Sequence, residues 1–401
     1  MNPNSEHLQS LLAQVTGFIY PNEIEIHWSI LIVVYPYITG LVAGAFILAS
    51  LVKVFNVEEV RPTYRLALMT ALSFMVVAPL PLLLHLGHPE RFYEILLAPN
   101  LTSAMAMFGF VYGWYLMGVL LLEVWFEFRR DLIALGQSSR GLMRWVYKAA
   151  SLFSTDTSEA AMAFDHKAIR LITIIGIPSA FLLHGYVGFI FGSVKANPWW
   201  SSVLIPIVFL MSAIVSGIAL VVVLYMMLSA IRREPIDMKC LDTITSYLFY
   251  AVIVDFTLEA LDFTHRLYES EESVKILGTL IQQKLFLSLI VLQILIGMIV
   301  PLAILVFAKW RTFSDDGRKL LYFTAALMIQ LGIFSTRWNI VIGGQLFSKS
   351  FRGLMEYKMA IGGLEGFVTA LVLLILPFIV LTVMIKLLPT KRIIEEVHTA
   401  A

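Results

Sequence analysis

The chain contains a single cysteine, Cys240, among its 401 residues. One thiol cannot build a disulfide framework, and it cannot supply the several cysteine ligands of an iron–sulfur cluster. Any iron–sulfur chemistry must therefore come from another subunit.

Charged residues are also scarce. They make up 14% of the chain, whereas hydrophobic residues make up 59% and the mean hydropathy is +0.83. Soluble domains are closer to one-quarter charged and half apolar. The net charge of +1 gives no indication of a nucleic-acid partner. Residues 1–26 contain no Lys or Arg, so we expect no cleavable signal peptide. The composition is that of a polytopic membrane protein surrounded by lipid.

Long apolar segments recur along the whole sequence, and about 20 apolar residues suffice to cross a bilayer. We predict an all-α bundle of about nine transmembrane helices, forming one integral membrane domain over residues 1–401. The N-terminal surface segment covers 1–26, with a short helix at 8–20. A cytoplasmic loop covers about 129–167, with an amphipathic helix near Leu142–Phe153. The predicted spans are 28–52, 63–86, 103–127, 168–194, 202–229, 243–265, 279–307, 319–342 and 364–388.

Lys and Arg are distributed unevenly between the two sides of this bundle. If the N-terminus lies outside, the inner segments carry 19 of the 29 and the outer segments carry 7. Cytoplasmic connections are enriched in Lys and Arg. We therefore expect the N-terminus outside and the C-terminus inside.

One predicted span, 243–265, carries a line of ionisable residues that continues just past its end. The members of this carboxylate ladder are Asp255, Glu259, Asp262 and Arg266. Their spacing of i, i+4, i+7 and i+11 places them within roughly 60° of arc on a helix. Ionisable groups at membrane depth are costly and usually functional. The ladder is either a proton route to the outer water or a structural stripe of ion pairs.

Other polar groups lie at a similar depth in the outer half. His184 either hydrogen-bonds a helix carbonyl or donates to a quinone. Arg337 cannot lose its charge, so we expect Asp262 or Asp255 beside it. Glu123 is expected at the inner interface, with little other polarity in the inner half.

Glycine and proline mark further features of the spans. Gly40-x3-Gly44 and Gly188-x3-Gly192 have the spacing of closely packed helices. Tyr35 precedes Pro36, which leaves a backbone carbonyl without its helical partner and predicts a kink beside a phenol.

The end of the second span combines apolar and titratable residues. The run is His85-Leu86-Gly87-His88-Pro89-Glu90-Arg91-Phe92, followed by Asn100 and Ser103-Ala-Met. It resembles the turn of the NrfD/polysulfide-reductase membrane-subunit (PsrC-like) family, and the length is closest to the DsrP-like and HybB hydrogenase-type members. One departure is His88, which stands where an arginine is common in that family.

The resemblance implies a bacterial or archaeal cytoplasmic-membrane protein that holds no haem or iron–sulfur cluster itself. Its substrate would be menaquinone or ubiquinone. A periplasm-facing, ferredoxin-like iron–sulfur subunit would dock on the outer face, with further cytochrome and catalytic subunits in the same complex. Anaerobic respiration and sulfur metabolism are the implied settings, and quinone oxidoreductase activity would belong to the complex.

Each candidate residue then receives a role. Asp255, Glu259 and Asp262 would carry protons, with Arg337 setting their charge. The expected quinone-binding residues are Tyr35, His85, His184 and Arg266. The expected docking residues are His88, Glu90 and Arg91.

Two other functions remain open from the sequence. A proton-coupled secondary transporter also buries carboxylates, but usually near the midplane of a repeated fold. A haem b cytochrome needs two facing histidines, for which His85 and His184 are the candidate pair.

Overall fold

The computed structural model describes residues 16–18, 26–100, 102–269, 272–311, 313–346, 348, 350 and 352–390. In this part of the chain, nine helical segments are long and apolar enough to cross a membrane, which confirms the predicted number. The segments are Ile30–Lys53, Glu58–His85, Gly109–Ser138, Glu159–Gly192, Ile205–Arg232, Met238–Arg266, Val274–Trp310, Asp315–Gln345 and Phe367–Leu387.

Five of these segments are formed by one continuous helix each. They are α2 (Ile30–Lys53), α9 (Glu159–Gly192), α10 (Ile205–Arg232), α11 (Met238–Glu269) and α15 (Phe367–Leu387). The others join shorter helices end to end. They are η2 (Glu58–Val60) with α3 (Arg61–Val77) and α4 (Leu80–His85); α6 (Ala104–Gly113) with η4 (Trp114–Leu120) and α7 (Leu121–Ser138); α12 (Glu272–Leu280) with η5 (Ile281–Ile299) and α13 (Val300–Trp310); and α14 (Asp315–Val341) with η6 (Gly343–Gln345).

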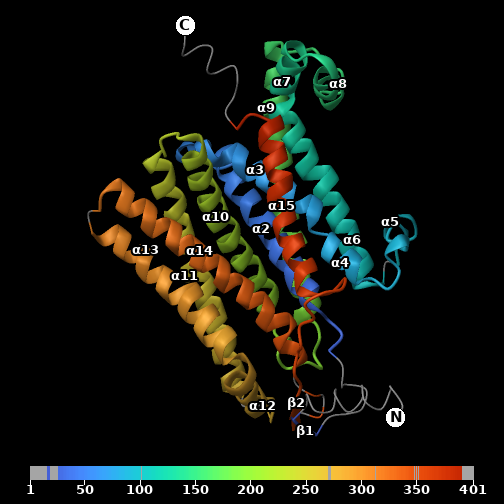
Figure 1. The fold of residues 1–401 in the computed structure, drawn as a ribbon, viewed down its shortest axis with the longest axis vertical. Coiled ribbons are helices and arrows are strands. Elements are labelled where there is room, and N and C mark those ends of the chain that lie inside the picture. The colour runs from blue at the N-terminus through green and yellow to red at the C-terminus, as the bar shows by residue number, and fades with distance from the viewer. Residues whose placement is uncertain are drawn as a thin grey trace.

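Figure 1 shows the helices running between two ends of the bundle. We call one the α8 end, because it holds α8 (Gly141–Ala150) and the connections at 54–57, 233–237 and 313–314. The other is the His88 end, which holds residues 86–100, 102–103, 193–204, 342–346 and 352–366. Its short elements are η3 (Pro89–Arg91), α5 (Glu94–Leu97), β1 (Thr16–Phe18) and β2 (Arg352–Leu354), and the two strands pair antiparallel.

Helix α2 lies at the centre of the bundle and is buried along nearly its whole length. It packs against α3, α9, α10 and α14. A Cβ on Gly44 would lie 2.7 Å from the Gly217 Cα, closer than real Cβ contacts come, so α2 and α10 meet backbone to backbone. A Cβ on Gly188 would likewise lie 2.7 Å from the Pro206 Cα. Both glycine motifs therefore pack helices, as predicted from their spacing.

The connection at 129–167 contains the amphipathic helix expected near Leu142–Phe153, which is α8 (Gly141–Ala150). The rest of this stretch is also mostly helical, because α7 runs to Ser138 and α9 begins at Glu159. The helices continue past their apolar windows because Arg129 on α7 pairs with Asp165 on α9 at 2.7 Å. The helix expected at 8–20 falls largely outside the described residues, and its described part, Thr16–Phe18, is strand β1.

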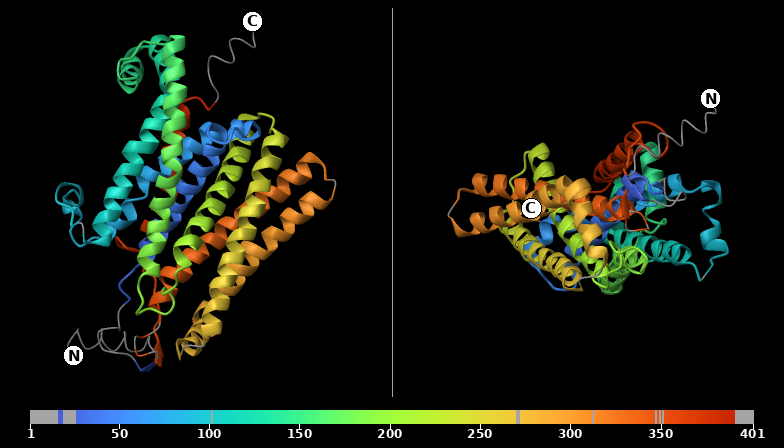
Figure 2. Two further views of the ribbon diagram at one scale, coloured as in Figure 1. Left: turned by 180° about the vertical axis from the view of Figure 1, so that it is seen from behind. Right: turned by 90° about the horizontal axis from the view of Figure 1, so that it is seen from below.

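Figure 2 shows how the helices are arranged around this centre. In the left view, seen from the side opposite to Figure 1, α9 runs along the front of the bundle beside α7 and α10. In the right view, α13 and α14 lie at one side of an elongated bundle and α5 projects at the other. The ladder helix α11 packs against α10 and α13, on the side away from α5.

Candidate functional site

Helix α11 brings the carboxylate ladder to the inside of the bundle. Asp255 is 1% exposed and Glu259 6%, while Asp262 and Arg266 are half-buried nearer the His88 end. Arg266 Nε donates to Asp262 Oδ2 over 2.9 Å, and the Ser202 hydroxyl also donates to Asp262. Asp262 and Arg266, nearer the His88 end, therefore form an ion pair, whereas Asp255 and Glu259 are buried carboxyl groups.

Glu259 is held by amide side chains that sequence reasoning missed. Gln293 Nε2 donates to Glu259 Oε2 over 2.8 Å, and Asn339 Nδ2 donates to Gln293 Oε1 over 2.7 Å. A cavity of about 50 Å³ lies between these groups and Asp262. That volume suits a few water molecules at most, and it is too small for a quinone ring. Both residues could have been found from the sequence, because each is an amide side chain inside an apolar span.

Arg337 on α14 is fully buried, but its hydrogen-bond partners are not those expected. Its Nη2 donates to Ser212 Oγ over 2.7 Å and to His184 Nε2 over 3.2 Å. The guanidinium also lies 4.2 Å from the centre of the Phe209 ring. Asp262 is wrong as its partner, because that carboxylate pairs with Arg266.

Asp255 interacts with this arginine through space only. Its anion is repelled by Glu259 and attracted by Arg337. Neither carboxylate oxygen of Asp255 has a hydrogen-bond partner among the described residues. Arg337 Nε and Nη1 have none there either. A buried carboxyl group and a buried guanidinium thus keep hydrogen-bonding capacity for a water or a substrate.

A separate apolar cavity is linked to Arg337 through Tyr37. It measures about 540 Å³ and is bordered by α2, α3, α10, α14 and α15. Its polar lining consists of Tyr37 and Gln330, whose side chains share a hydrogen bond of 2.7 Å. Tyr37 interacts electrostatically with Arg337 and packs edge-on against Phe334, with ring centres 5.3 Å apart. Tyr37 was not among the residues singled out from the sequence.

Two of the predicted quinone-binding residues, Tyr35 and His85, do not line this cavity. Tyr35 is buried on α2 and interacts with Tyr112 rather than with Arg337. His85 Nδ1 lies 3.0 Å from Glu365 Oε2 at the His88 end, with 22% of its side chain exposed. His184 instead bonds Arg337. The two histidines therefore have different charged partners.

The predicted docking residues form an exposed turn. The side chains of His88, Glu90 and Arg91 are 75%, 65% and 60% exposed. His88 Nδ1 lies 3.0 Å from Glu90 Oε1, and Arg91 Nε donates to Glu94 over 2.8 Å. The bond from Arg91 lowers the pKa of Glu94. A docking partner would have to compete with Glu94 for Arg91.

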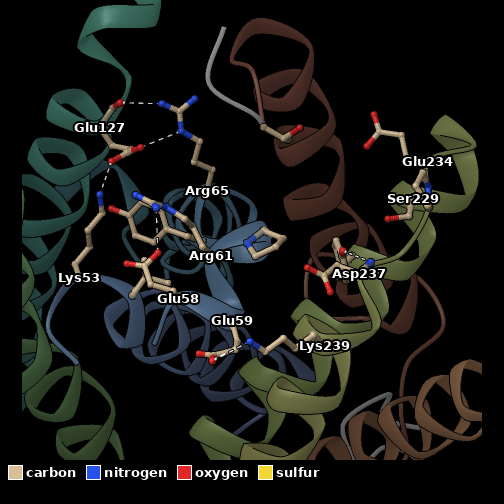
Figure 3. Close-up of a pocket in the computed structure, with 16 residues that line it drawn as sticks. Lys53, Glu58, Glu59, Arg61, Arg65, Glu127, Ser229, Glu234, Asp237 and Lys239 are labelled. Atoms are coloured by element: carbon tan, nitrogen blue, oxygen red, sulfur yellow. Dashed lines mark hydrogen bonds and ion pairs between the residues drawn. The ribbon is translucent and has the colours of Figure 1, made fainter. Parts of the chain in front are cut away.

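Buried polar groups are also present toward the α8 end of the bundle. Glu123 is 0% exposed, and Glu127, Arg65 and Asp131 are buried as well. Arg65 bonds both Glu127, at 2.9 Å, and Asp131, at 2.6 Å. Lys53 completes this α8-end cluster with a 3.0 Å bond to Glu127, shown in Figure 3.

Comparison with known proteins identifies the fold. The family described as "Polysulphide reductase, NrfD" matches residues 21–349. The chain belongs to the NrfD family. It is accordingly a multi-pass protein of the cytoplasmic membrane and a membrane subunit of a respiratory oxidoreductase complex.

Several curated NrfD-family relatives match over long stretches. The C subunit of selenate reductase from Mesobacillus selenatarsenatis is 31% identical over 389 residues, covering 92% of this chain and 88% of that protein. The Hdr-like menaquinol oxidoreductase integral membrane subunit of Archaeoglobus fulgidus is 24% identical, covering 86% and 77%. Protein NrfD of Escherichia coli is 27% identical, covering 49% and 58%.

Proposed function

We propose that this chain oxidises quinol from the membrane and passes the electrons to an iron–sulfur subunit docked at the His88 end. Relatives named for a selenate reductase and a menaquinol oxidoreductase support this direction of electron flow. The single cysteine supports the need for an electron-accepting partner.

The observation that carries the proposal is the apolar cavity lined by Tyr37, which interacts electrostatically with the buried Arg337. Ligand cavities usually measure about 300–1,000 Å³ and combine apolar walls with a few polar groups. The cavity of about 540 Å³ at Tyr37 has this character. Several of its lining side chains, including Leu327 and Leu331, are 45–46% exposed on the outer surface of the bundle, where lipid would lie. A quinol can therefore enter from the bilayer.

Quinol oxidation releases two electrons and two protons, so the site needs a base. We assign this role to Asp255, whose oxygens lack hydrogen-bond partners among the described residues. Arg337 would offset part of the cost of charging this buried carboxyl group, and Tyr37 would orient the ring oxygen. Protons would then pass to Glu259 and Asp262, each about one helical turn further along α11.

The distribution of Lys and Arg supports proton release on the periplasmic side of the membrane. With 19 Lys and Arg in the predicted inner segments and 7 in the outer ones, we propose that the His88 end faces the periplasm. Tyr37 lies seven residues into α2, about 10 Å along the helix from that end. Electrons and protons would both leave toward the exposed turn at His88.

The first experiment measures menadiol-driven electron delivery in membranes that contain the complete complex. Asp255→Asn keeps the side-chain volume but removes the base, so we expect turnover to fall by about 100-fold or more. Asp316→Asn is the control, because that carboxylate is 93% exposed beside Lys319. Full activity in Asp255→Asn would refute the assignment.

The second experiment locates the ring. Leu331→Trp adds bulk inside the cavity, and Leu371→Trp adds the same bulk at a position that is equally exposed but outside the cavity lining. We expect a higher KM for menadiol in Leu331→Trp only. His85→Ala tests the alternative that the quinol binds at His85, near Glu365. A raised KM in His85→Ala, with an unchanged KM in Leu331→Trp, would place the quinol-binding site at the His88 end.

A further inference from the structure

The α8 end of the bundle contains a polar cavity of about 730 Å³ that the proposed quinol chemistry does not use. Lys53, Tyr64, Arg65 and Glu127 line its inner wall. At its mouth, Lys239 and Glu59 lie 3.3 Å apart with side chains 76% and 38% exposed. Figure 3 shows Glu127 bonded to Lys53 and Arg65 on one side, with Ser229, Glu234 and Asp237 across from them. Because acids and bases alternate around it, the cavity suits water rather than an ion of one sign.

Beyond the wall of this cavity lies Glu123 on α7, which is 0% exposed. Its Oε1 accepts hydrogen bonds from the Thr173 hydroxyl over 2.9 Å and from the Tyr64 hydroxyl over 3.5 Å. Its Oε2 has no hydrogen-bond partner among the described residues. Tyr64 therefore touches both the cavity and the buried acid.

Glu123 and Glu127 lie one helical turn apart, yet their surroundings differ. Glu127 accepts from Lys53 over 3.0 Å and from Arg65 over 2.9 Å, so its charge is paired. Within the described residues, no cation lies within ion-pairing distance of Glu123, and two hydroxyls are its donors. Burying an unpaired carboxylate is costly, so the neutral acid is the favoured form of Glu123.

The titratable groups around Glu123 come from each neighbouring element. They are Lys53 on α2, Tyr64 on α3, Tyr115 on η4 and Glu127 on its own helix, and α9 contributes the neutral Thr173. Lys53 favours the anion, whereas Glu127 disfavours it. The opposed charges leave burial as the main influence on the protonation of Glu123.

We propose that Glu123 is a proton-binding acid that exchanges its proton with water at the α8 end through the Tyr64 hydroxyl. In the forward step, a hydronium ion in the cavity gives a proton to the Tyr64 oxygen and becomes water. At the same time the original Tyr64 hydroxyl proton passes to the Glu123 carboxylate. The reverse step returns the proton to the cavity.

This site is separate from the acids on α11 and does not depend on quinol chemistry. It would give the chain a proton-binding group in contact with the side of the membrane opposite the His88 turn. The proposal can therefore fail while the proposed quinol oxidation stands, and the reverse also holds.

Infrared spectroscopy of the purified complex tests the proposal. Subtracting the spectrum of Glu123→Gln from that of the unsubstituted chain should leave the carbonyl band of one protonated carboxylic acid. In D2O this band should shift quickly in the unsubstituted chain. In Tyr64→Phe the exchange should slow by roughly 100-fold, because the hydroxyl that relays the proton is gone.

Tyr112→Phe is the matched control, because that buried hydroxyl bonds the Met75 carbonyl and lies about three helical turns before Glu123. Its exchange rate should equal that of the unsubstituted complex. Absence of the difference band would overturn the proposal, and so would unchanged exchange in Tyr64→Phe.

A chemical measurement on the unsubstituted chain covers the case in which Glu123→Gln does not assemble. Dicyclohexylcarbodiimide adds to protonated carboxyl groups in apolar surroundings and, after rearrangement, remains attached whole as an N-acylurea. Peptide mass spectrometry should find the adduct on Glu123 and not on Glu127. Modification of Glu127 alone, or of neither residue, would overturn the proposal.

Discussion

The guanidinium of Arg337 donates to the imidazole of His184, Nη2 to Nε2, over 3.2 Å in the centre of the bundle. Arginine has no acceptor, so Nε2 must be the unprotonated nitrogen and His184 must be the neutral tautomer with its proton on Nδ1. That Nδ1 has no partner among the described residues. His184 on α9 is thus an uncharged hydrogen-bond acceptor for the Arg337 cation on α14.

The same contact explains the glycine at position 40 on α2. A Cβ there would lie 3.2 Å from His184 Cε1, which is tighter than most real Cβ contacts. Gly40 therefore lets the imidazole approach α2 and reach Arg337. Three helices cooperate to place one buried charge beside the Asp255 and Glu259 carboxylates.

We predict that His184→Phe destabilises the chain. The ring would still fill the space, but Arg337 would lose an acceptor while staying fully buried. Losing one partner of a buried polar group costs about 1–3 kcal/mol. The thermal unfolding midpoint in detergent should fall, whereas His88→Phe, at a 75% exposed side chain, should leave it unchanged. Equal midpoints for the two variants would contradict this reading of the Arg337 site.

The spans and the ladder face could be predicted because both depend on local spacing. Hydropathy alone located the nine spans, and the i, i+4, i+7 pattern put Asp255 and Glu259 on a buried face of α11. The bond between Arg337 and His184 joins residues 153 positions apart, and no local pattern encodes it. Sequence reasoning therefore found both residues but not their relationship.

The α8-end cluster was missed for a different reason. None of Lys53, Arg65 and Glu127 was singled out from the sequence, because charged residues near the ends of spans usually face water. The structure instead extends α7 past Glu127 and turns Arg65 inward to meet it at 2.9 Å. Opposite charges on neighbouring helices can neutralise each other below the surface, and only tertiary contact reveals it.

Arg65→Gln should destabilise the bundle strongly. The change leaves Asp131 buried without its 2.6 Å partner and removes the cation that lies 4.6 Å from the Phe128 ring centre. Breaking a buried ion pair in this way costs about 3–5 kcal/mol. Arg61→Gln is the matched control, because Arg61 and its partner Glu58 are both 60% exposed. Such surface pairs contribute about 0–1 kcal/mol, so detergent denaturation should separate the two variants clearly.

Gly44→Ala should loosen the contact between α2 and α10. The new methyl group would lie 2.1 Å from the Ala213 carbonyl oxygen, so one helix must move away. Overpacking of this kind costs about 1–3 kcal/mol. Gly185→Ala adds the same methyl group where no atom lies within 4 Å, and its unfolding midpoint should match that of the unsubstituted chain. A midpoint for Gly44→Ala equal to that of Gly185→Ala would mean that the helices meet less closely.

The orientation of the bundle can be tested by cysteine labelling. Because Cys240 is the single cysteine of the chain, a Cys240→Ser background contains no thiol. Single cysteines are then placed at Glu90 on the exposed turn and at Ser139, beyond the end of α7. Because Lys and Arg gather in the predicted inner segments, an impermeant maleimide added to intact spheroplasts should label Glu90→Cys at once. Ser139→Cys should react only after the membrane is permeabilised. The opposite labelling pattern would place the His88 end in the cytoplasm, and the proposed docking face and proton exit would have to be exchanged.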